Sequence, residues 1–256
     1  MLESLAGLLA LSPGQALFAL GTVFAAGVVR GFSGFALSAL TVAGLVAVLP
    51  PVALIPVCFV LEMAASLVSV RGGLREADRG LVLGLIAGSF AGLPIGLAVT
   101  RALDPDASRV AALCLLLCLA LAQLLRVAPA WLTTRSGLLG TGLAAGIATG
   151  LASIGGMVVA LYFLVRELPA ATMRSSLVIF LFVGVASSGF WLVASGVMDA
   201  LAIRRGLVLA PVVIAGVLLG ARFFEPSRQR LYRRVCLWLL VGLALAGLAR
   251  QLLGTG

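Results

Sequence analysis

Apolar stretches of about 20 residues recur along this 256-residue chain, and a helix of that length crosses the hydrocarbon core of a bilayer. Within lipid, only helices and closed β-barrels satisfy their backbone hydrogen bonds, and the alternating pattern of barrel strands is missing here. The chain is 62% hydrophobic and 11% charged, with a mean hydropathy of +1.22, which excludes a soluble domain of this size. The sequence therefore predicts an all-α polytopic membrane protein.

The charged residues narrow the class further. All 18 basic residues are arginine, with no lysine or histidine, and the net charge is +9. In a soluble protein this excess would suggest nucleic acid, but most arginines here fall in short loops, where topology and anionic lipid headgroups account for them. The Gly-x-Ser-Gly pattern at residues 31–34 fits the rhomboid proteases, yet their serine needs a histidine base, and a Walker A loop needs lysine. We therefore expect no enzyme, catalytic residue, cofactor, metal site or nucleic-acid partner, but contact with membrane lipids.

The chain is similar to itself after a shift of 119 residues. The aligned pairs are Gly21-Thr22 with Gly140-Thr141, residues 25–27 with 144–146, Gly31 with Gly150, and Leu49-Pro50 with Leu168-Pro169. We predict two repeats, 1–128 and 129–256, each with a broken apolar segment followed by three long apolar runs. The predicted ranges are 15–49, 52–70, 80–100 and 110–125 in the first repeat, and 137–165, 170–195, 206–221 and 231–249 in the second.

Arginine placement indicates whether the broken segments cross the membrane or turn back, because cytoplasmic loops collect arginine. If both segments cross, the loop arginines divide eight to eight between the two sides; if both are re-entrant hairpins, they divide eleven to five. The hairpin arrangement is favoured. It leaves three crossings in each half, so the halves become inverted repeats with both termini on the outer face. In transporters of this plan, substrate binds where discontinuous helices meet, and one repeat rocks against the other.

The first break, at residues 30–35, places a guanidinium, a hydroxyl and two glycines at membrane depth. A charge there is costly unless it is paired, hydrated or functional, although an arginine can also snorkel to the interface. We expect a helix to restart at Ser33 or Gly34, so that its free N–H groups, its dipole and Arg30 favour an anion. The candidate binding residues are Arg30, Ser33, Gly34, Phe35 and Ser38.

The second break, at residues 150–156, has no arginine of its own. The next run places Arg174 about one turn inside, either as a second anion ligand or as an ordinary positive anchor. Glu62 is the only carboxylate well inside an apolar run, and it fits either an ion pair with a buried arginine such as Arg30 or proton coupling. The candidate binding residues of this half are Ser153, Gly155, Gly156, Arg174, Ser175 and Ser176.

These motifs resemble a known family. Gly-x-x-Arg-Gly-Phe-Ser-Gly-Phe at residues 27–35 is echoed by Gly-x-x-Ser-Ile-Gly-Gly at residues 150–156, and each is followed by a proline-led helix, at Pro50-Pro51 and at Pro169. The pattern is similar to that of the sulfite exporter (TauE/SafE) family, also called the toluene-sulfonate uptake permease family, including a later arginine matched by Arg174. The resemblance implies eight membrane segments and carriage of small sulfur-containing or organic anions such as sulfite, sulfonates or sulfoacetate.

We therefore predict a multi-pass secondary transporter of the cytoplasmic (inner) membrane that binds a small anion between the two breaks. Arg30 and Arg174 would neutralise the anion, while serine hydroxyls and helix N-termini would donate hydrogen bonds to it. A passive anion channel and a membrane assembly or scaffold protein are the alternatives, although short loops offer little docking surface. A homodimer is left open.

Overall fold

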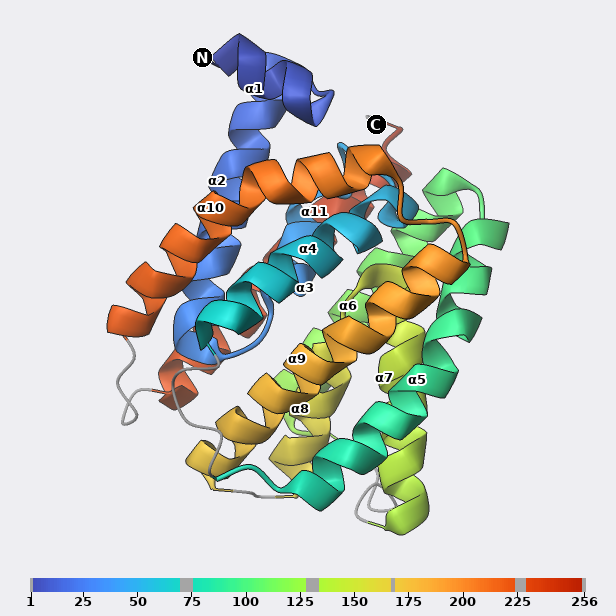
Figure 1. Cartoon of the computed structure of the whole chain (residues 1–256), viewed down its shortest axis with the longest axis vertical. Helices are drawn as coiled ribbons and strands as arrows, with labels where there is room; N and C mark the ends of the chain where they lie inside the picture. The colour runs from blue at the N-terminus through green and yellow to red at the C-terminus, as the bar shows by residue number, and fades with distance from the viewer. Residues whose placement is uncertain (1, 70–75, 128–133, 167–168, 224–228, 255–256) are drawn as a thin grey trace.

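The computed structural model describes residues 2–69, 76–127, 134–166, 169–223 and 229–254. Every regular element in these ranges is a helix (Figure 1), and seven of the helices are long and apolar enough to cross a membrane. The predicted all-α polytopic class is therefore confirmed. The helices are α1 Leu2–Leu9, α2 Pro13–Ser33, α3 Leu37–Leu45, α4 Pro51–Ser69, α5 Arg79–Ala102, α6 Pro105–Leu125, α7 Arg135–Ala152, α8 Gly155–Val165, α9 Ala170–Ala194, α10 Ala200–Arg222 and α11 Gln229–Leu252.

The predicted apolar runs coincide with helices, and the larger differences lie at two helix starts. α6 begins at Pro105 rather than at 110, and α10 at Ala200 rather than at 206. Both helices start early because an aspartate caps them. The carboxylate of Asp104 accepts the Ala107 N–H at 2.9 Å, and that of Asp199 accepts the Ala202 N–H at 2.6 Å. The short helix α1 is not among the predicted elements.

The first break lies later than predicted. α2 continues through Ser33, because the Gly34 N–H still donates to the Arg30 carbonyl at 2.9 Å. Gly34 (φ 78°) and Ala36 (φ 73°) then adopt left-handed conformations, and α3 starts at Leu37. The expectation that a helix restarts at Ser33 or Gly34 is wrong, since this glycine ends a helix, a common role for glycine. Arg30 consequently lies in the last turn of α2.

The second break has the same layout. α7 ends at Ala152, Ser153 is left-handed (φ 58°), and α8 begins at Gly155. The ends of α2 and α7 are 119 residues apart, and so are the starts of α4 and α9. In Figure 1 the first hairpin starts from the end of the bundle where both chain termini lie, and the second starts from the opposite end. The two breaks thus share one layout, and the inverted repeat stays a prediction.

Glycines hold two pairs of helices at very short range. Gly27 and Gly31 of α2 face Gly216 and Gly220 of α10, and a Cβ added to Gly31 would lie 2.3 Å from the Val217 carbonyl oxygen. Residue numbers rise together along both helices, so the two run parallel. Small residues let helix backbones approach closely, which drives association in lipid, where hydrophobic burial between helices contributes little. An equivalent parallel seam joins α5 to α7 through Gly88, Gly92, Gly96, Gly142, Gly146 and Gly150.

Each glycine seam joins one predicted repeat to the other, since α2 and α5 belong to the first repeat and α7 and α10 to the second. Figure 1 shows α2, α3, α4 and α10 gathered on one side and α5, α7, α8 and α9 on the other. We call these groups the α2/α10 unit and the α5/α7 unit. Rocking of repeat against repeat would have to separate both seams, so the packing does not fit that expected motion.

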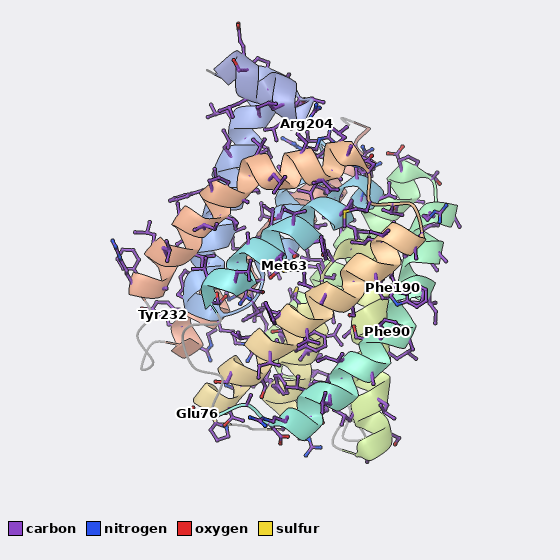
Figure 2. All side chains as sticks on the ribbon, in the orientation of Figure 1. Met63, Glu76, Phe90, Phe190, Arg204 and Tyr232 are labelled. Carbon is purple, nitrogen blue, oxygen red and sulfur yellow. The ribbon has the colours of Figure 1, made fainter. Side chains whose placement is uncertain are left out.

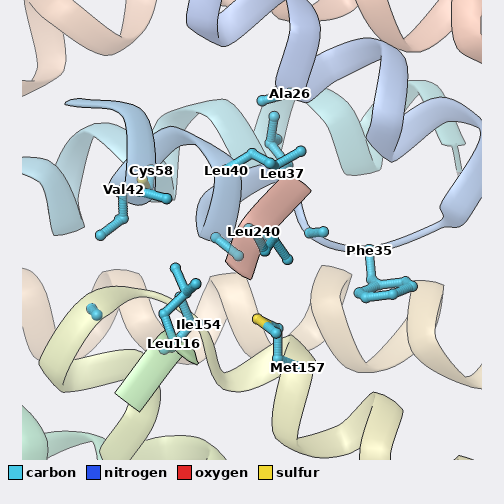
Figure 3. Packing of buried hydrophobic residues seen from close by; sticks show 14 of the residues in the cluster. Ala26, Phe35, Leu37, Leu40, Val42, Cys58, Leu116, Ile154, Met157 and Leu240 are labelled. Atoms are coloured by element: carbon cyan, nitrogen blue, oxygen red, sulfur yellow. The ribbon is translucent and has the colours of Figure 1, made fainter. Parts of the chain in front are cut away.

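The main apolar core lies where the two breaks approach each other. Figure 3 shows Phe35 and Leu37 of the first break near Ile154 and Met157 of the second, with side chains of α6 and α11 beside them. Many large apolar side chains instead face outward, as expected for lipid contact. Among them are Phe90 and Phe190 (Figure 2), whose rings stack at 6.0 Å and are 41% and 59% exposed.

The two ends of the bundle carry different sets of arginines. Both chain termini and Arg204 lie at one end, and Glu76 and Tyr232 lie at the other (Figures 1 and 2). At the end with the termini, arginines donate to helix-terminal carbonyls: Arg109 Nε to Val46 at 3.1 Å and Arg205 Nε to Leu9 at 2.7 Å. These bonds hold α6 to α3 and α10 to α1. Both termini lie at this end (Figure 1), as expected whether the broken segments turn back or cross.

Candidate functional site

A cavity of about 60 Å³ lies between the two units, and both helix breaks line it. Phe35, Ala36, Ser38 and Ala39 come from the first break and the start of α3, and residues 153–157 come from the second break and α8. α4, α5, α7 and α9 complete the wall. Since a water molecule needs roughly 10–15 Å³ of such volume, the cavity has room for a few waters or one small ion.

The wall is mostly apolar, and its polar members are nearly all hydroxyls. The hydroxyls of Thr149 and Ser188 donate to backbone carbonyls of their own helices, at 2.7 and 2.8 Å. Those of Ser89 and Ser153 make no hydrogen bond to another described residue, so they are free to bind a ligand. Among the described lining residues, only Glu62 is charged. The polar lining residues are Ser38, Glu62, Ser89, Thr149, Ser153 and Ser188.

Glu62 reaches from α4 to the first turn of α3. Its Oε1 accepts the Ser38 hydroxyl at 3.0 Å and the Ser38 N–H at 3.4 Å, and its Oε2 lies 3.5 Å from Arg30 Nε. Only 1% of the Arg30 side chain and 9% of the Glu62 side chain are exposed. Opposite charges this deeply buried need each other, because an isolated one would cost several kcal/mol of desolvation.

Arg30 stands behind Glu62 and is not among the described residues that line the cavity. Its Nη1 donates to the Gly34 carbonyl and so closes the C-terminal end of α2. Arg30 Nε, Arg30 Nη2 and Glu62 Oε2 are buried without a hydrogen-bond partner among the described residues. Unsatisfied buried polar atoms are costly and therefore uncommon. Three such atoms thus belong to one ion pair at the edge of the cavity.

Two helices begin at the cavity without a side-chain cap. α3 (N-cap Ala36) and α8 (N-cap Ile154) have none, whereas Ser, Thr or Asp side chains cap α2, α5, α6, α7 and α10. At α3, the Glu62 carboxylate occupies the positive helix end by binding Ser38. At α8, the position equivalent to Glu62 in the second half, 119 residues later, is Leu181. This leucine packs at the start of α8, since its Cδ2 would lie 3.2 Å from a Cβ added to Gly156. The first N–H groups of α8 therefore face the cavity with no acidic side chain beside them.

Six of the predicted site residues line the cavity: Phe35, Ser38, Glu62, Ser153, Gly155 and Gly156. Gly155 fits there because it lacks a side chain, since a Cβ would lie 2.3 Å from the Ala145 carbonyl oxygen.

The other predicted residues lie elsewhere. Within the described chain, Ser33, Gly34, Ser175 and Ser176 do not line the cavity. The Ser33 hydroxyl donates to the Phe35 carbonyl at 2.7 Å, and the Ser176 hydroxyl accepts the Asp78 N–H at 3.1 Å, which ties α9 to the start of α5. The side chain of Arg174 is outside the described residues, so its role as an anion ligand stays a prediction.

The sequence analysis missed a second guanidinium close to the site, which is half-buried. Arg233 of α11 donates from Nη2 to Gln123 Oε1 at 2.9 Å and to the Ala160 carbonyl at 3.3 Å, and its guanidinium lies 5.9 Å from the Phe35 ring centre. The arginine count places Arg233 with the loop arginines, because it lies only two residues inside the predicted run 231–249. The sequence did contain one indication of a buried polar partner, Gln123 inside the apolar run 110–125. The lining hydroxyls gave no signal, because serine and threonine recur throughout the chain.

Two interrupted helices meet at an internal cavity inside a bundle of span-length helices, and this is the plan of a polytopic membrane protein such as a transporter. Residues 19–247 match the model of the family described as sulfite exporter TauE/SafE, and the chain belongs to that family, which confirms the resemblance seen in its motifs. Comparisons with curated proteins and with solved structures give no match. Membership implies a membrane transporter of sulfur-containing anions.

Proposed function

We propose that this protein is a secondary transporter of the cytoplasmic membrane that carries a small sulfur oxyanion, such as sulfite, through the cavity between the two helix breaks. The observation that carries this proposal is that both breaks line one internal cavity, at which α8 begins without a side-chain cap. Backbone N–H groups of α8 and the hydroxyls of Ser89 and Ser153 would bind the anion's oxygens. A cavity of about 60 Å³ suits an anion of a few heavy atoms, so an aryl sulfonate would require the cavity to enlarge.

Arg30 would act indirectly in this scheme. It holds Glu62 and the C-terminal end of α2 in place, and it offsets the carboxylate's charge beside the cavity. Arg174 would supply a further positive charge at the start of α9. One copy of the chain contains the whole cavity, so the proposed function does not require a homodimer.

The arginine count favours a cytoplasmic location for the end of the bundle opposite the chain termini, by eleven loop arginines to five. Substrate would then pass between that end and the outer face with the termini. Alternating access would come from movement of the α2/α10 unit against the α5/α7 unit, because the cavity lies between them and each glycine seam lies within one unit.

Cross-linking tests this motion, in a background with the native cysteines replaced by serine. Phe59 of α4 and Gly189 of α9 face each other across the two units, since the Phe59 ring lies 2.9 Å from a Cβ added to Gly189. Cysteines at these positions, joined by a short thiol-reactive cross-linker, should stop transport. As a control, cysteines replacing Val60 and Gly206, which touch within the α2/α10 unit, should leave transport intact when joined. Transport that survives the Phe59–Gly189 link would contradict the proposed motion.

Transport of sulfite into vesicles that contain the purified protein tests the function itself. Ser153→Ala and Ser89→Ala should each slow uptake several-fold, and Arg174→Ala should abolish it. Ser69→Ala is the matched control, because that hydroxyl bonds to the Ala65 carbonyl at the end of α4, away from the cavity, and uptake should not change. Faster exchange when sulfite is present on both sides would distinguish a transporter from a passive channel. Uptake no faster than in protein-free vesicles would refute the proposal.

A further inference from the structure

We infer that the substrate occupies the cavity as a singly charged, protonated oxyanion, such as hydrogensulfite, and that Glu62 is the residue that selects this form. The inference rests on the proposed function and adds the protonation state of the substrate. It follows from one feature of the site. Among the described residues, the charged side chain that lines the cavity is Glu62, which is itself an anion.

The first step is the charge at the site. Arg30 and Glu62 cancel each other, and the carboxylate lines the cavity while the guanidinium does not, within the described chain. A bound monoanion leaves Arg30, Glu62 and the ligand with one net negative charge, which the charge proposed for Arg174 would offset. A dianion leaves two, and one of them would stay uncompensated. Because the Glu62 side chain is only 9% exposed, this repulsion is weakly screened by solvent. A doubly charged oxyanion is therefore disfavoured relative to its protonated form.

The second step is hydrogen bonding. Glu62 Oε2 is buried and accepts no hydrogen bond from a described residue, while Oε1 is already used by Ser38. A fully deprotonated oxyanion offers only acceptors and would leave Oε2 unsatisfied. A protonated one donates its O–H to the carboxylate, and such a charge-assisted bond is stronger than a neutral one.

The two ends of the ligand are thereby assigned. Its charged oxygens face the uncapped start of α8 at Gly155 and Gly156, where free N–H groups and the helix dipole favour negative charge. Its hydroxyl faces Glu62, which already fills the equivalent position at the start of α3. Glu62 and its counterpart in the second half, Leu181, differ in charge. The site therefore has one side that accepts a hydrogen bond from the ligand and another that binds the ligand's negative charge.

Few other groups of the described chain that titrate or carry charge face Glu62. α2 contributes Arg30 and α3 contributes Ser38, and on α4 itself Cys58 lies one turn away. The described lining residues of α5, α7, α8 and α9 are apolar or hydroxylic, and α10 packs against α4 through Gly206 and Val60. From α11, Arg233 lies over the Phe35 ring, and from α6 comes the neutral Gln123 that binds it.

The wild-type protein in vesicles provides the first test. With total sulfite held constant, the initial uptake rate should follow the hydrogensulfite fraction and fall about tenfold per pH unit once the dianion dominates. At fixed pH, methanesulfonate, a monoanion of similar size without an acidic proton, should compete at least tenfold more weakly than sulfite, and sulfate should not compete. Equal competition by methanesulfonate and sulfite would overturn the inference, and this arm needs no variant.

The second test uses Glu62→Gln, with Glu76→Gln as the matched control, because Glu76 is an exposed carboxylate before α5 and not part of the cavity. The glutamine amide can donate to an oxyanion and carries no charge. Glu62→Gln should therefore lose the preference for hydrogensulfite and gain at least tenfold in competition by methanesulfonate, whereas Glu76→Gln should behave as wild type.

The experiments distinguish failure of the proposed function from failure of the further inference. If no sulfur oxyanion is transported, the proposed function fails. If sulfite is transported but wild type and Glu62→Gln show the same pH profile and the same competition, the proposed function stands and the inference fails. In that case a water molecule, not the substrate, satisfies Glu62 Oε2.

Discussion

Replacing Gly146 by alanine tests the glycine seam between α5 and α7. A Cβ at this position would lie 2.2 Å from the Ser89 carbonyl oxygen and 2.8 Å from the Leu93 nitrogen. Real Cβ contacts do not fall below 3.0 Å, and the obstacles are backbone atoms, so the two helices must separate by about 1 Å at the point of contact. A gap of 0.5–1 Å removes roughly a quarter to a half of each dispersion contact along the seam.

The expected cost is therefore that of overpacking, about 1–3 kcal/mol, and we place Gly146→Ala at the upper end because no flexible side chain can yield. The better helix propensity of alanine returns at most about 1 kcal/mol. A net loss of about 2 kcal/mol corresponds to a fall in melting temperature of roughly 4–8 °C for a chain of this size. Thermal unfolding of the detergent-solubilised protein, followed by size-exclusion chromatography, measures this change.

Gly21→Ala and Gly242→Ala are the matched controls, since a Cβ at either position meets no atom within 4 Å. Both should melt at or slightly above the wild-type temperature. If Gly146→Ala melts together with these two controls, close backbone packing does not hold α5 to α7, and the division into two interlocked units is wrong.

Three further changes probe other contacts. Arg30→Ala should destabilise the fold by about 3–5 kcal/mol because it strands a buried carboxylate, and adding Glu62→Ala should recover most of that loss in the same melting assay. Asp199→Ala should cost about 1 kcal/mol through loss of the α10 cap, seen as a lower melting temperature; an unchanged melt would argue against capping. Arg233→Leu leaves two hydrogen-bond acceptors without their donor and should lower the free energy of unfolding by about 1–3 kcal/mol. The control Arg234→Leu, at the exposed neighbouring residue, should leave the melting temperature unchanged.

The candidate site shows where inference from the sequence stopped. Both breaks were located because glycine and a polar residue inside an apolar run are local signals, and six of the predicted residues line the cavity. The orientation of Arg30 was not accessible in this way, because it depends on whether Gly34 ends one helix or begins the next. Arg233 was missed because it lies near the start of the predicted run 231–249, where an arginine usually anchors a helix at the membrane surface. Its contact with Gln123 of α6 is visible only in the tertiary structure.

The sequence by itself determined the membrane class and the approximate positions of the long helices and the two breaks, because run length, glycine and proline act through backbone geometry and lipid solvation within a few residues of the chain. Only the tertiary structure decided which helices pair. The seams α2–α10 and α5–α7 cross the boundary between the repeats, and they depend on glycines far apart in sequence meeting face to face. The pairing of Glu62 with Arg30 and Ser38 is decided in the same way, since it requires α2, α3 and α4 to converge around one buried carboxylate.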